Sequence, residues 1–231
     1  MKEIVVGLHI PKTAGSSFKA ILEKVYGKRY LWIPNVHTAY YAWVEHIKRE
    51  DLYNIDFIYG HIPHGVHKFF PEDIKCNYIT FLRNPIERLM SMYHLNMLKS
   101  TATIDNFLQW VGYYKIADIE NGMTRIINGT IQNLVDVTSS LVTERDYLVA
   151  QQNLADMYFV GTTEHFENDL KFLAEKLSWE SIPEQEKLLY YPDRLSKKDL
   201  PTLDREKLRG SQLFDFLLWK EALEFSKTRS S

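Results

Sequence analysis

The chain has 231 residues, of which 45% are hydrophobic and 25% are charged, and its formal net charge at pH 7 is −2. This composition is typical of a folded globular protein with a single domain over 1–231, and the missing basic excess argues against nucleic acid or an anionic membrane as a partner. The single cysteine, Cys76, can form neither an internal disulfide nor a cysteine-rich zinc site. The first apolar stretch ends at Pro11, too early for a secretory signal or a membrane span, so we expect a cytoplasmic protein.

Strand-like apolar segments alternate with segments of helical periodicity along the chain. Residues 3–10 predict a buried strand, residues 11–15 a turn, and residues 18–26 a helix that Ser16 or Ser17 caps. Further strands are predicted over 57–59, 77–82 and 158–161. Further helices are predicted over 85–99, 104–111, 118–127, 144–155, 164–177 and about 203–226, with a helical elaboration over about 100–157 and a surface connection over 178–201. The alternation predicts an α/β fold, P-loop-like, with helices on both faces of a parallel sheet and ligands at the carboxyl ends of its strands.

The turn after the first strand, in the segment HIPKTAGSSF, has the features of a phosphate-binding loop. Gly15 precedes a helix, whose first backbone N–H groups point at any anion placed there. Lys12 adds a positive charge, and Ser16 and Ser17 add hydroxyl donors. The order differs from that of the ATP-binding P-loop, in which the lysine follows its second glycine, because Lys12 comes before Gly15. The loop is therefore predicted to bind phosphate, but not as an ordinary nucleoside triphosphatase.

A second anion site is predicted where the strand TFLR runs into the helix NPIERLMSMYH. Arg83 ends the strand, and an arginine can bond two oxygens of a phosphate at once. Ser91 lies two helical turns beyond Asn84, near the same face of the helix, so one phosphate could reach both Arg83 and Ser91. Each residue alone could be an ordinary surface residue. Two separate phosphate sites together indicate a ligand with two phosphates far more specifically than either site does alone.

Three histidines follow the short strand in the segment FIYGHIPHGVH: His61, His64 and His67. Pro63 and Gly65 prevent a regular helix, and the spacing fits no standard set of metal ligands, so we expect no metal. His61 stands at the carboxyl end of a strand, beside the proposed phosphate sites, and histidine is suited to remove a hydroxyl proton near neutral pH. His64 is the second candidate for this base or for substrate contact. His67 is interpreted as a packed or surface residue.

The two loops together resemble those of sulfotransferases that use 3′-phosphoadenosine-5′-phosphosulfate (PAPS), specifically the family that contains the heparan and dermatan uronosyl 2-O-sulfotransferases. The resemblance implies that PAPS is the donor and that Lys12 contacts the oxygen bridging its phosphate and sulfate. Because Lys12 and the helix N-terminus supply positive potential, we expect that no metal is needed. It implies that the 5′-phosphate is lined by Thr13, Ala14, Gly15, Ser16 and Ser17. The family element Arg-[Asn/Asp]-Pro-x-x-Arg-x-x-Ser-x-Tyr, which binds the 3′-phosphate, is filled here by Arg83, Asn84, Pro85, Arg88, Ser91 and Tyr93.

The resemblance extends in patches from about residue 5 to about residue 225 and is consistent with a soluble, bacterial-type member. A Tyr-x-Gly-His element of the family supplies the catalytic base, which implies that role for His61. Residues 121–125 resemble an element near the family's active site, so Arg125 either contacts substrate or is an exposed helical residue. Residues 159–164 are interpreted as scaffold, and Arg88 as an ion-pairing residue within its own helix.

The sequence thus predicts an enzyme that transfers a sulfuryl group from PAPS to the hydroxyl of a small-molecule or carbohydrate acceptor. One alternative is a small-molecule kinase with a divergent phosphate loop. Another is a module that binds 3′,5′-ADP without catalysis and would not need His61. If neither His61 nor His64 is the base, the nearest acidic candidates in sequence are Glu45, Glu50 and Asp56.

Overall fold

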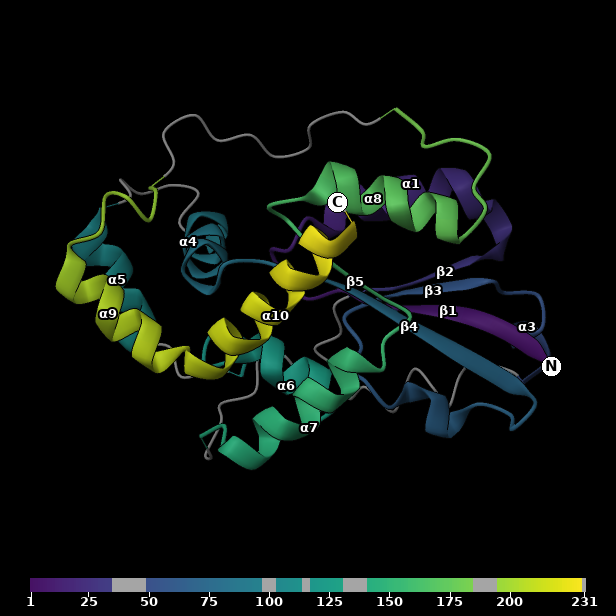
Figure 1. Cartoon of the computed structure of the whole chain (residues 1–231), viewed down its shortest axis with the longest axis horizontal. Coiled ribbons are helices and arrows are strands. Elements are labelled where there is room, and N and C mark those ends of the chain that lie inside the picture. The colour runs from purple at the N-terminus through teal and green to yellow at the C-terminus, as the bar shows by residue number, and fades with distance from the viewer. Residues whose placement is uncertain (35–48, 97–102, 114–116, 131–140, 185–194, 230–231) are drawn as a thin grey trace.

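The computed structural model of the protein describes residues 1–34, 49–96, 103–113, 117–130, 141–184 and 195–229 (Figure 1). Its centre is a five-stranded sheet in the order β2-β3-β1-β4-β5, in which all neighbouring strands are parallel. The strands are β1 (Lys2–Leu8), β2 (Tyr30–Ile33), β3 (Phe57–Gly60), β4 (Ile74–Leu82) and β5 (Phe159–Thr162). The predicted α/β fold with a parallel sheet is confirmed.

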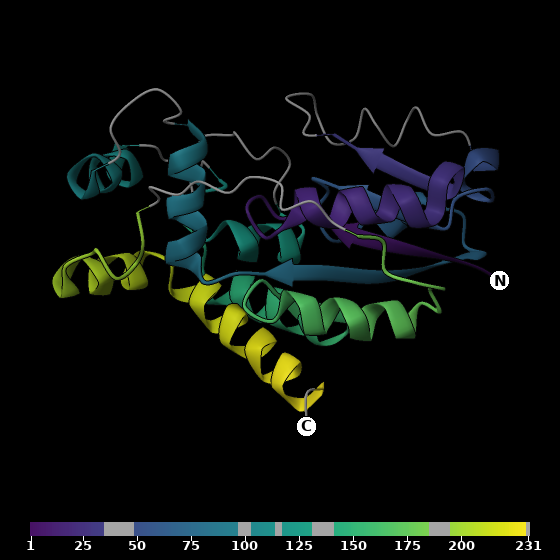
Figure 2. The same ribbon diagram turned by 90° about the horizontal axis from the view of Figure 1, so that it is seen from above.

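Helices surround the sheet and follow its strands in the chain. They are α1 (Gly15–Tyr26), α3 (Arg49–Leu52), α4 (Pro85–Asn96), α5 (Ile104–Tyr113), α6 (Gly122–Asn128), α7 (Glu144–Ala155), α8 (Phe166–Lys176), α9 (Thr202–Ser211) and α10 (Leu213–Arg229). Two 3-10 helices, η1 (Gly27–Arg29) and η2 (Val66–Phe69), complete the described elements. Figures 1 and 2 show α1 and α8 on one face of the sheet, and α6 and α7 on the other. Helix α10 passes beside the edge strand β5 and contacts α6 and α7 as well as α8.

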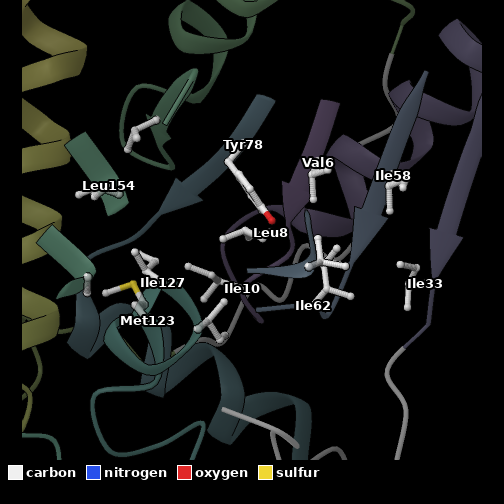
Figure 3. Packing of buried hydrophobic residues seen from close by; sticks show 14 of the residues in the cluster. Val6, Leu8, Ile10, Ile33, Ile58, Ile62, Tyr78, Met123, Ile127 and Leu154 are labelled. Carbon is white, nitrogen blue, oxygen red and sulfur yellow. The ribbon is translucent and has the colours of Figure 1, made fainter. Parts of the chain in front are cut away.

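Side chains alternate between the two faces of the strands and fill a separate apolar layer on each. The layer under α1 and α8 contains Phe18, Phe57, Tyr59 and Phe81, among others. The opposite layer is shown in Figure 3. There, residues of the strands pack against residues of α6 and α7; those labelled are Val6, Leu8, Ile10, Ile33, Ile58, Ile62, Tyr78, Met123, Ile127 and Leu154. Burial on both faces explains why the central strands have nearly continuous apolar sequences.

A third apolar cluster lies beyond the carboxyl ends of the strands and joins α4, α5, α9 and the start of α10. It contains Leu89, Tyr93, Phe107, Trp110 and Phe216, all buried. This cluster fixes α4, whose first residue follows β4 after only two residues. The polar loops at the carboxyl ends of the sheet are therefore anchored on one side by the sheet and on the other by helices.

The register of the strands brings three chain segments to one edge of the sheet. Leu8, the last residue of β1, is level with Gly60, the last residue of β3, and with Thr80 of β4. Since β1 lies between β3 and β4, the segments that begin at His9, His61 and Arg83 leave the sheet side by side. These segments hold the residues for which the sequence predicts chemistry.

Several predicted boundaries were wrong. Strand β2 was missed because its four residues follow directly on a 3-10 turn with no break in composition. Helix α6 begins at Gly122 rather than at residue 118, since Asn121 adopts left-handed backbone angles with φ 46°. The helix expected over about 203–226 is two helices that meet at Gln212, where the side chain of Asn121 contacts the backbone of Ser211, Phe214 and Asp215. Residues 97–99 of the helix predicted over 85–99 lie outside the described part of the chain.

Candidate active site

The turn between β1 and α1 presents a helix N-terminus without a side-chain cap. Helix α1 begins at Gly15, so Ser16 and Ser17 lie inside its first turn and neither is the cap that we predicted. The N-cap is Ala14, with left-handed backbone angles (φ 66°), and Lys12 is also left-handed (φ 68°). The first turn holds no acidic residue. The first N–H groups of a helix have no acceptor within the helix, so this turn, with the charge of Lys12 beside it, is a suitable site for an anion.

The hydroxyl of Thr13 closes the turn on itself. Its Oγ1 donates a 2.8 Å hydrogen bond to the carbonyl of Ile10, and the residue is 2% exposed. The hydroxyl proton of Thr13 is therefore engaged within the turn. Ser16 is exposed and Ser17 partly exposed, so these two hydroxyls are the ones placed at the surface of the turn.

His61 is held beside this turn by its ring nitrogen. Nδ1 lies 2.9 Å from the carbonyl oxygen of His9. A carbonyl can only accept, so Nδ1 carries the proton and Nε2 keeps the lone pair that a base requires. Burial lowers the pKa of His61 to about 4, with the hydrogen bond to His9 opposing the shift. His61 is therefore neutral at pH 7, with a pKa below the ordinary histidine value of 6.5.

Arg83 joins the end of β4 to the same turn. Its Nη1 donates a 3.2 Å hydrogen bond to the carbonyl of Lys12, and its Nη2 lies 3.9 Å from a carboxylate oxygen of Glu87. Glu87 is itself paired with Lys197 at 2.9 Å, which balances its charge. Ser91 is buried on α4, the helix that Arg83 precedes.

Helix α4 starts as the sequence predicted. The side-chain oxygen of Asn84 accepts from the N–H groups of Ile86 and Glu87 at 3.1 and 3.3 Å. The N–H of Asn84 donates at 2.9 Å to Glu164, which follows β5 and also accepts from the indole of Trp219 at 3.1 Å. Glu164 thus ties together the carboxyl ends of β4 and β5 and α10, and the scaffold role predicted for residues 159–164 agrees with these contacts.

Arg88 is buried completely and pairs outside its own helix, so the predicted ion pair within the helix is wrong. Its Nη2 forms an ion pair with Asp118 and donates at 2.8 Å to the carbonyl of the same residue. Its Nε donates at 3.2 Å to the carbonyl of Pro11 in the phosphate-binding turn. A Cβ on Gly122 would lie 2.9 Å from Nη2, so glycine there leaves room for the guanidinium. Arg83 and Arg88 together brace two consecutive carbonyls of the turn.

His64 and His67 have different neighbours from His61. The ring of His64 packs against Tyr78 at 4.4 Å, and Nδ1 of His67 lies 2.9 Å from the hydroxyl of Tyr78. Both histidines line a cavity of about 520 Å³ over the first half of β4, together with Lys68, Phe70, Pro71, Glu72, Ile74, Cys76 and Tyr78. The structure thus joins His61 to the segment of the phosphate-binding turn through its hydrogen bond and ring contact with His9. His64 instead packs on Tyr78.

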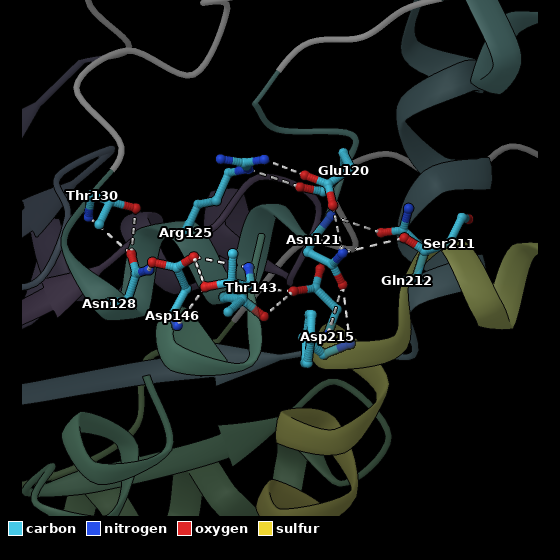
Figure 4. A network of polar contacts seen from close by, with 12 residues as sticks. Glu120, Asn121, Arg125, Asn128, Thr130, Thr143, Asp146, Ser211, Gln212 and Asp215 are labelled. Atoms are coloured by element: carbon cyan, nitrogen blue, oxygen red, sulfur yellow. Dashed lines mark hydrogen bonds and ion pairs between the residues drawn. The ribbon is translucent and has the colours of Figure 1, made fainter. Parts of the chain in front are cut away.

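Arg125 is 8% exposed, so it is not an exposed helical residue. It forms an ion pair with Glu120 and donates from Nε to the carbonyl of the same residue at 3.0 Å. Figure 4 shows this pair beside a buried network in which Asp215 of α10 accepts from the N–H of Thr124 at 2.7 Å. The network anchors α6 to α10 next to Asn121. Substrate contact by Arg125 stays a prediction.

Of the acidic residues considered as alternative bases, Asp56 is excluded by its position. It precedes β3, at the amino end of the strand that His61 follows, and it is paired with Lys2 at 2.6 Å and with Arg29. Glu50 lies in α3, which precedes β3 at the same end of the sheet (Figure 1). Glu45 lies outside the described residues.

Sequence reasoning missed His9, which carries the contacts that hold His61. Its carbonyl accepts from His61, and its ring lies 4.2 Å from the ring of His61. A usable signal was present: His9 is the first polar residue after a buried strand and stands directly before the phosphate-binding turn. Polar residues at the carboxyl ends of parallel strands are the ones expected to face a ligand.

The family model of the sulfotransferase family matches residues 2–209 of the chain. The match covers most of the 231 residues, so the chain belongs to the sulfotransferase family and is a transferase. A search of curated proteins found no match. Among the described residues, no three His, Cys, Asp or Glu side chains are grouped to hold a metal ion, and no described helix is long and apolar enough to cross a membrane.

Proposed function

We propose that the protein transfers a sulfuryl group from PAPS to the hydroxyl of a small-molecule or carbohydrate acceptor. One observation carries the proposal: three neighbouring strand ends bring together a helix N-terminus preceded by Lys12, a neutral histidine and an arginine. His61 is hydrogen-bonded to His9, and Arg83 to Lys12. Membership of the sulfotransferase family supports sulfuryl transfer as the reaction. The O-linked product and the donor are the parts that we propose.

The residues present fit a donor with two separate phosphates. The first turn of α1, with Lys12 and no acidic residue, would hold the 5′-phosphosulfate, with Ser16 and Ser17 offering hydroxyls. Arg83 and Ser91 would hold the 3′-phosphate, with Arg83 already turned toward the carbonyl of Lys12. The two sites share the contact between Arg83 and the turn, which suits one ligand that spans both.

The chemistry assigns one task to each residue. PAPS supplies the sulfuryl group: a bond forms between the acceptor oxygen and sulfur, and the bond between sulfur and the 5′-phosphate oxygen breaks. Nε2 of His61 takes the acceptor's proton, because Nδ1 is already bonded to the carbonyl of His9. Lys12 and the N–H groups of α1 stabilise the negative charge that develops on the 5′-phosphate. Arg83 fixes the donor in place.

Binding of product nucleotide tests the donor. We expect 3′,5′-ADP to bind much more tightly than ATP with Mg²⁺ and to raise the melting temperature more, because only the bisphosphate occupies both anion sites. Calorimetry and thermal unfolding measure the two effects. Equal affinity for ATP with Mg²⁺ would favour the kinase alternative, and tight 3′,5′-ADP binding without any sulfuryl transfer would favour the non-catalytic module.

The substitution Arg83→Ala tests the 3′-phosphate site. It removes a charged phosphate contact of about 2–3 kcal/mol, so 3′,5′-ADP should bind at least about tenfold more weakly. AMP lacks the 3′-phosphate, and its affinity should stay the same. Arg29→Ala is the matched control, because Arg29 pairs with Asp56 near the amino end of β3. If Arg83→Ala leaves the dissociation constant of 3′,5′-ADP unchanged, the 3′-phosphate binds elsewhere.

A further inference from the structure

His9 is a buried histidine whose main chain joins two strand ends. It follows the last residue of β1 and is 8% exposed. Its N–H donates to the carbonyl of Gly60 at 2.8 Å, and its carbonyl accepts from Nδ1 of His61 at 2.9 Å. The backbone of His9 therefore connects the segment after β1 to the segment that carries the proposed base.

The side chain of His9 stacks on aromatic rings from β3 and its loop. Its ring lies 4.2 Å from that of His61 at an interplanar angle of 24°, and 5.1 Å from that of Tyr59 at 19°. Trp32 of β2 contributes a tilted contact at 5.6 Å. Since His61 is also held at Nδ1, the stack and the hydrogen bond together restrict both the tilt and the rotation of its ring.

Another edge of the same ring meets the phosphate-binding turn. A Cβ added to Gly15 would lie 1.6 Å from Nε2 of His9 and 2.0 Å from Cδ2. The imidazole of His9 thus fills the space that a side chain at position 15 would take. Gly15 is the first residue of α1, whose first turn is the proposed site for the 5′-phosphosulfate. One side chain is therefore in contact with both the turn and the base.

We propose that His9 is a positioning residue that couples the phosphate-binding turn to His61, so that the packing of one ring sets the place of the donor and the direction of Nε2. This inference rests on the proposed sulfuryl transfer. Burial lowers the pKa of His9 well below its ordinary range, and His61, Lys12 and Lys19 lower it further, so the ring is neutral. Nδ1 of His9 has no hydrogen-bond partner within the described part of the chain, and the ring packs against those of His61, Tyr59 and Trp32.

Titration of His61 by NMR tests the coupling without any turnover. Among the described residues, the charged or titratable groups that act on the two rings or pack against them are Lys12, Lys19 and Tyr59, and burial raises the pKa of Tyr59 well above its ordinary value. In His9→Ala, water can reach His61, and its pKa should rise from about 4 toward 6.5. Sulfuryl transfer should fall about tenfold or more, while the affinity for 3′,5′-ADP changes less than about threefold.

A double-mutant cycle tests the contact at Gly15. Gly15→Ala alone should weaken 3′,5′-ADP binding about tenfold or more, because its Cβ collides with the ring of His9. In the His9→Ala background the space is free, and the same substitution should cost less than about threefold. An equal cost of Gly15→Ala in both backgrounds would show that the two residues are not coupled and would overturn the inference.

A second variant keeps the test decisive if His9→Ala does not fold. His9→Phe preserves a stacking ring, so His61 should keep its low pKa and transfer should stay within about threefold of the wild type. A loss of more than about tenfold in the transfer rate of His9→Phe would show that an imidazole nitrogen, and not ring packing, is required at position 9.

If His9→Ala shifts the titration of His61 but the wild type transfers no sulfuryl group, the coupling stands and the proposed function fails. If the wild type transfers sulfuryl groups but the pKa of His61 is unchanged in His9→Ala, the coupling is refuted and the proposed function stands.

Discussion

Replacing His61 by alanine is expected to slow sulfuryl transfer about 100-fold or more while the affinity for 3′,5′-ADP changes little. Nδ1 of His61 donates to the carbonyl of His9, so Nε2 is the ring nitrogen left to accept the acceptor's proton. The residue contributes nothing to the two proposed phosphate sites, so binding and rate should separate. Transfer of labelled sulfate from PAPS into hydroxyl compounds of a metabolite extract measures the rate, and calorimetry measures nucleotide binding.

The role of His61 as a base also predicts how the rate changes with pH: activity should be lost as the pH falls and His61 becomes protonated. Because burial lowers the pKa of His61 to about 4, the neutral, basic form persists as the pH falls through 6.5 and is lost only near pH 4. The rate constant kcat/KM should therefore decline near pH 4 to 5. A bound donor brings negative charge, which favours the protonated imidazole, so kcat should decline at a higher pH than kcat/KM. The His61→Ala enzyme should lack this acid limb.

His64→Ala is the matched control, since His64 packs on Tyr78 rather than on His9. It should lower the rate much less than His61→Ala. An active His61→Ala enzyme together with an inactive His64→Ala enzyme would move the base three residues along the loop. If neither substitution lowers the transfer rate, the base is an acidic residue. Asp56 is excluded as that base, because it lies at the opposite end of β3 from His61.

Much of this site could be predicted because its signals are local. A buried strand, a glycine-containing turn and an amphipathic segment define the β1–α1 unit, and Asn84 followed by Pro85 defines the start of α4. Parallel strands place their following loops at one edge, so Lys12, His61 and Arg83 could be expected to meet. The register of β1 with β3 and β4 places the segments that carry these residues side by side.

What could not be predicted depends on contacts between residues far apart in the chain. Arg88 pairs with Asp118, 30 positions away, although the sequence suggested only an ion pair within its own helix. The break at Gln212 comes from Asn121, more than 90 positions earlier, which bonds to the backbone on both sides of it. The shift in the pKa of His61 follows from burial, which periodicity does not reveal at a strand end.

Replacing Arg88 by methionine is expected to lower the free energy of unfolding by about 3–5 kcal/mol, because it leaves the buried carboxylate of Asp118 without its cation. For a chain of this length such a loss lowers the melting temperature by about 6–20 °C. The carbonyl of Pro11 also loses its donor, so the phosphate-binding turn should hold 3′,5′-ADP less tightly. Denaturant unfolding and thermal unfolding measure the stability.

Adding Asp118→Asn to Arg88→Met distinguishes two causes of the lost stability: the unpaired charge of Asp118 and the lost packing of the Arg88 side chain. Burial already raises the pKa of Asp118 and Arg88 opposes that shift, so without Arg88 the carboxyl group gains a proton more readily. Stability of Arg88→Met should therefore recover partly as the pH falls toward the raised pKa, and the double variant Arg88→Met/Asp118→Asn should be more stable at pH 7 than Arg88→Met alone. A loss of less than about 1 kcal/mol in Arg88→Met, or an equal loss in the double variant, would show that the ion pair is not what holds α4 against the turn before α6.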